Sequence, residues 1–496
     1  MITWGISANS HDAALAVFVN DELVFASHSE RFSGIKNDKH LCQELVDYAR
    51  QWGEPDRVYW YERPLLKTAR QLIAGQGWKW RENNIRKYLA RWNIRAPITY
   101  TSHHLSHAAA GYYTSTYSDA CVIVLDAIGE YNTFTIWHAE GDKISRRYSM
   151  DFPNSVGLWY SAMTQRCHLK PLEDEYILMG MAAYGNPDRL SREILDDFFC
   201  IDLPATEWDS YGTILSSRKN LHRGCMDWRP DLVVNDTFDI AAGTQAVYEY
   251  LLELIVHSAK FYSGSDNLVF TGGCALNCAA NRLLGKYYDN IWIMPNPGDA
   301  GSSIGSVLAH TKKRLAFSTA YLGYDMGQNA KNEEIVEYIL EHQICGLARN
   351  KAEFGPRALG NRSLIADPRG NDIKDRVNAI KHRQQFRPFA PAILEEHVHD
   401  YFDMPSGWRD SRYMQVVATC RHPDLYPAIV HRDGSSRVQT VAAGSGPFRE
   451  LLELWYAKTG CPMLLNTSLN IKGQPMVNDI EDARDFENRY GIKVFN

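Results

Sequence analysis

The sequence predicts an α/β fold, and segments in two parts of the chain carry that prediction. Near the amino terminus, "TWGISA", "ALAVFV" and "LVFASHS" are short β-branched or alternating runs separated by turn residues, which predicts an antiparallel meander. Further on, "ACVIVLDAIGE" is typical of a buried strand, and "NLVFTGGCALNCAANRLL" of a strand, a glycine turn and a helix. "IWIMPNPGDAGSSIGSVLA" repeats that plan. Such strand ends, which lead through acidic or glycine loops into helices, are where α/β proteins bind ligands.

Length and composition describe a globular protein of more than one domain. A chain of 496 residues is too long for one core and predicts two or three domains. The start of the chain has no basic stretch and no uninterrupted apolar run, so we expect neither a signal peptide nor a membrane span. The ten cysteines form no CxxC pair, which favours reduced thiols and a cytoplasmic location. A net charge of -6 still permits a nucleic-acid partner, because the distribution of charge matters more than its sum.

The stretch "TSHHLSHAAAGYYTS" raises the question of a metal site. His103 and His107 are four residues apart, so on a helix they share one face, while His104 points elsewhere. A zinc-protease helix of this spacing has glutamate beside the first histidine, and His104 in that position argues against this class. Two ligands do not make a site, and a packed or exposed helix that carries histidines is the alternative.

Two loop carboxylates supply what the histidine pair lacks. Asp126 ends a predicted strand, and Asp299 lies in a Pro/Gly loop before a predicted helix. Two carboxylates with two imidazoles suit a divalent transition metal such as iron, manganese or zinc. Each aspartate alone is equally well explained as the cap of the next helix. Gly272 and Gly273 follow another predicted strand and permit close approach of backbone to a ligand such as phosphate.

A second dense region begins near residue 350 and is rich in arginine beside turn residues. Guanidinium groups held by rigid turns suit bidentate recognition of phosphate or carboxylate. Phe354, Phe386 and Phe389 among these cations favour a shaped, partly buried pocket over the alternative of solvated loops. The cations are Arg357, Arg362, Arg369, Lys381, Arg383, Arg387 and Arg437.

These motifs, taken in order, resemble one known family. The chain is similar to the carbamoyltransferases that include the nodulation enzymes and the antibiotic O-carbamoyltransferases. The resemblance extends from residue 10 to about residue 478 and rests on many ordered motifs. They are "SHDAALAV", "SERFSGIKND", "HHLSHAAAGYYTS", "EYILMGMAAYG", "GGCALNCAANRL", "PGDAGSSIG", "EFGPRALGNRSLIADPR", "FRPFAPAIL", "HRDGSSRVQTV" and "LLNTSLNIKGQPMV".

The resemblance implies two modules and two reactions. Residues 1–325 would form a domain like the universal threonylcarbamoyl transferases, with the actin-like and sugar-kinase-like ATPase fold. Residues 326–496 would form an α/β YrdC-like domain that makes carbamoyl adenylate from carbamoyl phosphate and ATP with Mg²⁺. The first domain would then pass the carbamoyl group to a hydroxyl acceptor.

The resemblance also implies roles for particular residues. The metal ligands would be His103, His107, Asp126 and Asp299, with Fe²⁺ the expected ion and Mn²⁺ or Zn²⁺ as alternatives. The predicted catalytic residues are His11, Asp12, Lys381 and Arg383. His11 suits a general base for the acceptor hydroxyl, and its alternative is a turn residue that caps a strand. The predicted substrate-binding and nucleotide-binding residues are Gly272, Gly273, Asn277, Arg357, Arg362, Arg387, Arg437, Asn466, Ser468 and Asn470.

Some positions depart from the family pattern. Ala127 stands where the family commonly has glycine, and Ile177 stands where it usually has a lysine that would contact phosphate. The stretch before "FGPRALG" is also altered, and the carboxyl-terminal end is short. Because the metal quartet and the arginine motifs are intact, we expect a divergent or compact active member.

The segment before the histidine motif bears on the identity of the acceptor. Residues 67–95 carry eight Lys/Arg against the single acid Glu82, with Trp78, Trp80, Tyr88 and Trp92 interleaved. Such a segment can track a phosphate backbone and stack bases, or it is an amphipathic insertion packed on its domain. The resemblance extends to relatives in bacterial viruses, and it implies hydroxymethylated cytosine in DNA as one acceptor. A sugar or other natural-product hydroxyl is the alternative acceptor. A tRNA threonylcarbamoyl transferase and a noncatalytic ATP-binding scaffold are further alternatives, and a homodimer is left open.

Overall fold

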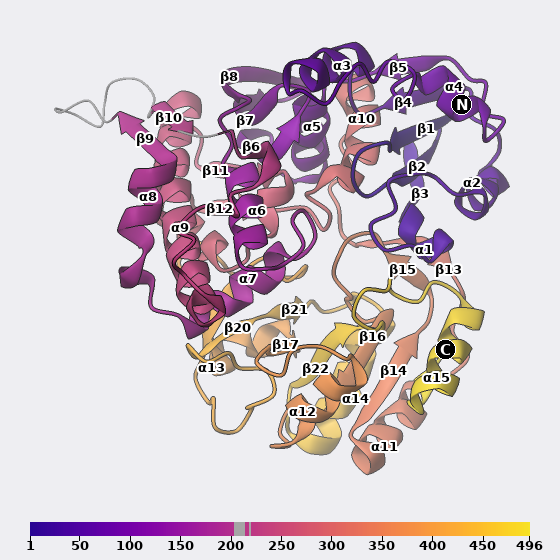
Figure 1. Ribbon diagram of the computed structural model, residues 1–496. Coiled ribbons are helices and arrows are strands. Elements are labelled where there is room, and N and C mark those ends of the chain that lie inside the picture. Colours follow the sequence, from indigo (N-terminus) through magenta and orange to yellow (C-terminus); the bar gives the residue numbers. More distant parts are fainter. Residues whose placement is uncertain (203–213, 218–219) are drawn as a thin grey trace. The chain divides into compact units, whose positions relative to one another are not determined.

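The computed structural model describes residues 1–202, 214–217 and 220–496 of the chain (Figure 1). The chain forms two compact units, each of which we describe by itself. The internal unit is Val58–Ala316, and the terminal unit combines Met1–Arg57 with Phe317–Asn496. Both units are α/β, as predicted. The division of the chain at residue 325 into two modules stays a prediction. Among the described residues, no helix has both the length and the apolar character needed to cross a bilayer.

The internal unit is built on a mixed sheet of five strands in the order β12-β11-β6-β7-β8. Strands β12, β11 and β6 are parallel, and β6, β7 and β8 are antiparallel. Strand β6 contains a fully buried run of apolar residues from Val122 to Leu125. Such a run is expected for a strand that is covered on both faces. The strands are β6 (Asp119–Gly129), β7 (Asn132–Glu140), β8 (Lys143–Asp151), β11 (Asn267–Thr271) and β12 (Asn290–Trp292). Two more strands of this unit, β4 (Arg57–Trp60) and β5 (Ile98–Tyr100), pair in parallel.

Helices α5 (His103–Thr114) and α10 (Ser302–Thr311) pack against each other, and α5 also packs on β6 and β11. The run Ala108–Ala110 is buried in this packing, because such small residues let the helix lie close to its neighbours. The segment after β11 forms short 3-10 helices, Gly273–Leu276 and Ala280–Lys286, rather than the predicted α-helix. The other α-helices of the unit are α3 (Pro64–Ile73), α4 (Ile85–Ala90), α6 (Val156–Arg166), α7 (Glu175–Met181), α8 (Ser191–Phe198) and α9 (Thr237–Ser263). A small hairpin pairs β9 (Phe199–Asp202) with β10 (Ile214–Ser217).

The terminal unit begins with the predicted antiparallel meander. Strand β1 (Ile2–Ser7) pairs with β2 (Ala14–Val19), and β2 pairs with β3 (Glu22–His28). Two helices follow, α1 (Ser29–Ser33) and α2 (Gln43–Ala49). In the carboxyl-terminal part, β13 (Tyr321–Asp325) pairs with β15 (Lys351–Glu353). A small sheet joins β18 (Phe402–Asp403), β19 (Val417–Cys420) and β20 (Ser435–Arg437).

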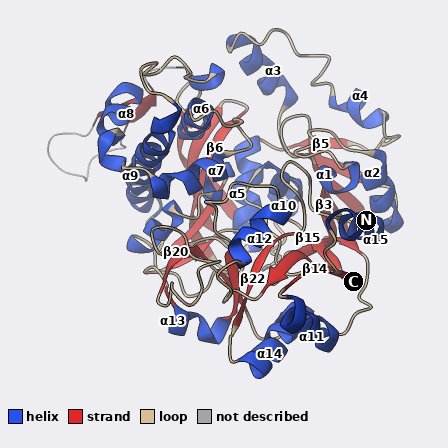
Figure 2. Cartoon of the chain, turned by 60° about the horizontal axis from the view of Figure 1, so that its bottom comes forward, coloured by secondary structure: helices blue, strands red, loops and turns tan. Residues whose placement is uncertain are grey.

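The largest sheet of the terminal unit has six strands in the order β21-β17-β22-β16-β14-β23. Its side chains alternate between two cores: Ile344 and Ala348 of β14 point to one face, and Cys345 and Leu347 to the other. Figure 2 shows α11 and α14 on one side of this sheet and α12 on the other. The strands are β14 (Ile344–Ala348), β16 (Arg362–Ala366), β17 (Ala390–Leu394), β21 (Gln439–Val441), β22 (Met463–Ser468) and β23 (Val494–Phe495). The helices are α11 (Asn332–His342), α12 (Ile373–Ile380), α13 (Val398–Tyr401), α14 (Pro447–Thr459) and α15 (Ile480–Tyr490).

Candidate metal centre and lysine cluster

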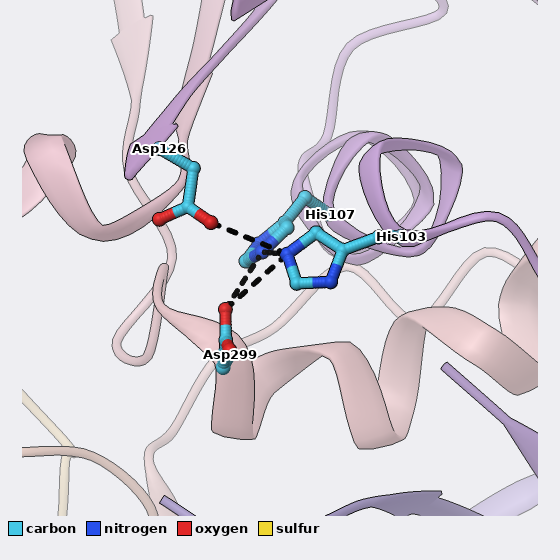
Figure 3. A group of neighbouring side chains, drawn as sticks. All are labelled: His103, His107, Asp126 and Asp299. Carbon is cyan, nitrogen blue, oxygen red and sulfur yellow. Dashed lines mark hydrogen bonds and ion pairs between the residues drawn. The ribbon is translucent and has the colours of Figure 1, made fainter. Parts of the chain in front are cut away.

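Four predicted metal ligands converge in the internal unit. The Nε2 atoms of His103 and His107 lie 3.1 Å apart, one helical turn from each other on α5. Asp126 Oδ2 lies 3.2 Å from His103 Nε2, and Asp299 Oδ1 lies 3.3 Å from His107 Nε2. Figure 3 shows the two imidazoles pointing between the two carboxylates. One ligand atom from each of the four residues lies within 4.8 Å of all the others.

The sheet explains why residues so distant in sequence meet here. Strands β6, β11 and β12 are neighbours and parallel, so the segments after them lie at the same edge of the sheet. Asp126 lies near the end of β6, where the pairing with β7 becomes irregular after Leu125. Asp299 opens the short 3-10 helix that follows β12. The position agrees with the general placement of ligand sites at the carboxyl ends of parallel strands.

Backbone groups behind the ligands hold them in orientation. His107 Nδ1 lies 3.2 Å from the carbonyl oxygen of Pro297, which fits a tautomer that donates there and leaves the Nε2 lone pair toward the cluster. Asp126 Oδ1 accepts a hydrogen bond of 3.1 Å from the Gly273 N–H, while Oδ2 faces His103. Gly272 has φ +94° and its backbone passes so close to Leu125 that a Cβ would lie 2.2 Å from the Leu125 carbonyl oxygen. This glycine turn therefore positions an aspartate that is itself a candidate ligand.

The charges in the cluster compensate one another. Burial opposes protonation of His103, but Asp299 and Asp126 outweigh it and raise the pKa of His103 well above its ordinary value. Burial likewise opposes ionisation of Asp299, and the two histidines reverse that effect and hold its pKa well below the usual range. Nearby, burial and the charge of His103 lower the pKa of His104 well below its ordinary value, and its Nδ1 lies 2.8 Å from Thr135 Oγ1. His104 thus lies outside the ligand cluster, as the sequence predicted.

These residues fit a divalent cation. Two buried imidazole nitrogens and two carboxylates present four facing donor atoms, and each imidazole can be neutral once a cation replaces its proton. A mixed nitrogen and oxygen set of this kind suits first-row transition metals. His103, His107, Asp126 and Asp299 would hold the ion.

The backbone of Gly129 touches the ring of His103. A Cβ at residue 129 would lie 2.1 Å from His103 Cδ2, so Gly129→Ala is expected to displace that imidazole and to weaken metal binding by about 10-fold or more. Gly298→Ala is the matched control, because Gly298 adjoins the ligand Asp299 and a Cβ there meets nothing within 4 Å. Metal titration of both variants checks this expectation, and equal affinities would contradict it.

Glu130, which the sequence did not single out as a site residue, connects the metal centre to helix α3. It is buried and has a positive φ of 56°, a conformation that is strained for a residue with a side chain. Glu130 Oε1 accepts a hydrogen bond of 2.5 Å from the Arg63 N–H, and its carbonyl oxygen accepts one of 3.1 Å from Arg70 Nε. Burial raises the pKa of Glu130 to about 6. The sequence signal was slight, namely an acid directly after the glycine that ends a strand.

In the terminal unit, Lys381 is the centre of a polar cluster. It follows α12, is buried, and donates from Nζ to Ser468 Oγ at 3.2 Å and to Asn470 Oδ1 at 3.0 Å. The carbonyl oxygens of Ser468 and Asn470 also accept from it. Burial lowers the pKa of Lys381 well below its ordinary value, and the charges of Arg383 and Arg387 act in the same direction. Two predicted motifs, Lys-x-Arg and Ser-x-Asn, are thereby in direct contact.

The other predicted residues of this region have distinct surroundings. Arg383 lies over the ring of Phe389, with its guanidinium carbon 3.9 Å from the ring centroid, and donates to Asn378 Oδ1 at 2.6 Å. Asn466 lies two residues before Ser468 on β22, so both side chains point to one face. In the described residues, the Asn466 Oδ1 atom is buried without a hydrogen-bond partner. Arg357, Arg387 and Arg437 are half-buried.

Arg362 is held by the protein backbone. Its guanidinium is fully buried, and within the described part of the chain it donates to carbonyl oxygens alone, those of Tyr324, Arg349, Asn350, Asn361 and Asn478. These bonds give the side chain a structural role, and its predicted contact with a ligand stays a prediction. Arg369 is exposed and pairs with Asp367 at 2.8 Å.

The remaining predicted residues lie elsewhere in the two units. His11 and Asp12 lie in the turn between β1 and β2, with His11 Nδ1 3.3 Å from Asp12 Oδ2. Burial opposes ionisation of Asp12, but its hydrogen bond to His11 and nearby positive charge outweigh this and lower its pKa. In the internal unit, Asn277 exchanges two amide hydrogen bonds of 3.1 Å and 3.0 Å with Gln245. Ile177 is buried in α7, so this position contributes to packing.

Comparison with known proteins decides the family. A family model described as "Carbamoyltransferase N-terminus" matches residues 61–308, and one described as "Carbamoyltransferase C-terminus" matches residues 336–495. The chain belongs to the carbamoyltransferase family. It is therefore a transferase, and the resemblance in its motifs is confirmed. The carbamoyltransferase models together span both the metal centre and the lysine cluster.

Two relatives and one solved structure illustrate the likeness of this carbamoyltransferase to known proteins. An uncharacterized protein of Synechocystis is 32% identical and matches 97% of this chain and 93% of its own length. Nodulation protein NolO of Bradyrhizobium diazoefficiens is 30% identical over 77% of this chain and 75% of its own length. The solved structure of HypF from T. kodakarensis covers 63% of this chain and 48% of its own length, at 12% identity and a TM-score of 0.38. A structural likeness at that level is too slight to support a conclusion.

Proposed function

We propose that this carbamoyltransferase uses carbamoyl phosphate and ATP to form carbamoyl adenylate and then transfers the carbamoyl group to a hydroxyl acceptor. The observation that supports the proposal best is the cluster of the buried His103, His107 and Asp126 with the half-buried Asp299 in a chain of this family. The contact of Lys381 with the Ser-x-Asn segment supports the adenylating half. In this proposal residues 1–325 carry the transfer step and residues 326–496 the activation step.

Activation proceeds by two successive reactions in the proposed site of the terminal unit. Carbamoyl phosphate and water give carbamate and phosphate, and a carbamate oxygen then attacks the α-phosphorus of ATP. A P–O bond forms, the bond to the β-phosphate oxygen breaks, and pyrophosphate leaves with Mg²⁺. Lys381 and Arg383 are the proposed catalytic cations, since positive groups held in place before the reaction stabilise the charge that develops on phosphate. Arg357, Arg362, Arg387, Arg437, Asn466, Ser468 and Asn470 are the proposed binding residues of this step.

The transfer step follows activation. The acceptor oxygen attacks the carbonyl carbon of carbamoyl adenylate, the C–O bond to AMP breaks, and the hydroxyl proton passes to a base. His11 is the proposed base and Asp12 its hydrogen-bond partner, because their side chains are in contact. Gly272, Gly273 and Asn277 are the proposed backbone and amide contacts to the adenylate. When bound, the divalent ion, which we propose is Fe²⁺, supplies a Lewis acid for the carbonyl or phosphate oxygen.

Two classes of acceptor remain in this proposal. One is the hydroxymethyl group of 5-hydroxymethylcytosine in DNA or in a nucleotide. The other is the hydroxyl of a sugar or natural product. The exposed Trp78 and Trp80, together with the exposed cations of residues 81–95 that have no acidic partner among the described residues, favour the first class.

Pyrophosphate release from ATP by the purified, iron-loaded protein tests the activation half. Carbamoyl phosphate is expected to stimulate release by about 10-fold or more without any acceptor, because adenylation precedes transfer in the proposed scheme. Release that does not respond to carbamoyl phosphate would contradict the proposed adenylate. Transfer is then followed with labelled carbamoyl phosphate on hydroxymethylated oligonucleotides and on aminoglycoside sugars.

A further inference from the structure

Helix α3 of the internal unit turns its charged face inward. Lys67 and Arg70 are buried, and Lys67 Nζ lies 2.6 Å from the equally buried Glu62 Oε1. Arg70 donates to the Glu130 carbonyl oxygen. An amphipathic helix normally buries its apolar face. In α3 the apolar face is exposed to solvent instead. The exposed apolar residues are Leu65 (67%), Leu66 (38%), Leu72 (51%) and Ile73 (70%).

The segment after α3 adds exposed rings and positive charge. Trp78 is 67% exposed and Trp80 41% exposed, whereas Tyr88 is buried and packs on the domain. Glu82 is the single acid of residues 64–95, and it pairs with Lys79 at 2.9 Å. Five exposed cations of this segment have no acidic partner among the described residues: Arg81, Arg86, Lys87, Arg91 and Arg95. We call the exposed part of residues 64–95 the basic aromatic surface.

Contacts within the internal unit connect this surface to the candidate metal centre. Glu130 Oε1 accepts from the Arg63 N–H at the start of α3, and the neighbouring Gly129 touches the His103 ring. Tyr61 packs on the same ring at a centroid distance of 5.2 Å, and its carbonyl oxygen accepts a hydrogen bond of 2.9 Å from Ser106 on α5. Helix α3 lies at an edge of the internal unit in both views (Figures 1 and 2). The surface and the four candidate ligands are therefore connected by direct contacts within one unit.

We propose that the basic aromatic surface binds single-stranded nucleic acid and presents a hydroxyl-bearing base to the metal centre. The proposal rests on the proposed function, and it names the acceptor class. A single strand combines anionic phosphates with apolar base faces, and the order Trp78, Lys79, Trp80, Arg81 alternates partners for the two. A base stacked in a duplex offers no access to a buried centre, so an unpaired base is required.

An anionic membrane is the competing partner for an apolar face with cations beside it. A helix that lies in a membrane interface carries its cations on its own outward polar face. The cations of α3 point inward, to Glu62 and to the Glu130 carbonyl oxygen, and cannot meet lipid headgroups. The geometry therefore favours the nucleic acid.

Fluorescence anisotropy of a labelled oligothymidylate with the full-length protein tests the proposal. Trp78→Ala with Trp80→Ala is expected to weaken binding by about 10-fold or more, since each ring offers a face on which one base can stack. Arg86→Glu with Lys87→Glu is expected to reduce the slope of log K against log salt by about 1.4 or more. Matched controls are Phe261→Ala and Arg147→Glu, an exposed ring and an exposed cation outside residues 64–95, which should bind as the parent does. All mutated side chains are exposed, so thermal midpoints should stay unchanged.

Three outcomes would overturn the proposal: no binding of oligothymidylate by the parent at low salt, binding to phosphatidylserine vesicles without binding to the oligonucleotide, or parental affinity in the tryptophan variant. Pyrophosphate release is measured without nucleic acid, so a failure of the surface proposal can be distinguished from a failure of the proposed function. Release without oligonucleotide binding would refute the surface alone, and binding without carbamoyl-phosphate-dependent release would refute the proposed function alone.

Discussion

Replacing His107 with alanine is expected to remove the metal and abolish carbamoyl transfer, while carbamoyl-phosphate-dependent pyrophosphate release persists. His107 supplies one of four converging donor atoms, and its Nε2 lies 3.1 Å from His103 Nε2. A Lewis acid contributes several kcal/mol to the transition state, so transfer should fall by about 100-fold or more. Metal content per chain, pyrophosphate release and labelled carbamoyl transfer are the three measurements.

Because His107 is fully buried, alanine leaves a cavity, and His107→Gln serves as a second variant of closer volume. His138→Ala is the matched control, since His138 is a half-buried histidine of β7 outside the cluster. It should keep metal and both activities. Equal loss of adenylation and transfer in a folded His107→Gln protein would count against two separate reactions.

The convergence of the four candidate ligands was predictable because each of these residues has a local signal. The spacing of His103 and His107 places them on one face of a helix, and Asp126 and Asp299 follow predicted strands. Parallel strands bring such ends to one edge, and the structure confirms that these four side chains meet. The sequence did not predict the hydrogen bonds that orient two of these side chains. Their partners, the Pro297 carbonyl and the Gly273 N–H, are backbone groups, which the identity of a residue does not reveal.

Two features escaped prediction because a pattern does not say which way a side chain faces. The periodicity of α3 indicates an amphipathic helix, but buried partners such as Glu62 and the Glu130 carbonyl draw its charged face inward. In the same way, Arg362 resembles the other loop arginines in sequence, yet surrounding carbonyl groups use its N–H donors. Both outcomes depend on contacts between residues distant in sequence.

The helix expected after β11 differs for a local reason. Asn277 Oδ1 accepts from the Ala280 N–H at 3.1 Å and also from Gln245, so the chain turns there and restarts as a second 3-10 segment. Asparagine side chains that bond nearby backbone compete with helix in this way. The strand and the glycine turn before it were predicted correctly.

Replacing Lys381 with methionine is expected to abolish carbamoyl-phosphate-dependent pyrophosphate release and to leave the metal in place. Methionine keeps the buried apolar stem and removes the ammonium that Ser468 and Asn470 surround. The lowered pKa of Lys381, caused by burial and by Arg383 and Arg387, indicates a site that favours an added negative charge such as phosphate. Loss of such a cation should slow adenylation by about 100-fold or more.

The same substitution has a structural cost that must be separated from the catalytic one. Acceptors left unpaired by the loss of Nζ destabilise the fold by about 1–3 kcal/mol each, so the thermal midpoint should fall. Lys381→Arg, which keeps the charge, should recover stability more than activity, because a planar guanidinium does not reproduce the four contacts of an ammonium. Lys351→Met, at an exposed lysine of the same unit, should change neither quantity. If Lys381→Met loses stability and still releases pyrophosphate at the parental rate, Lys381 organises the loop after β22 without contacting the reacting phosphates.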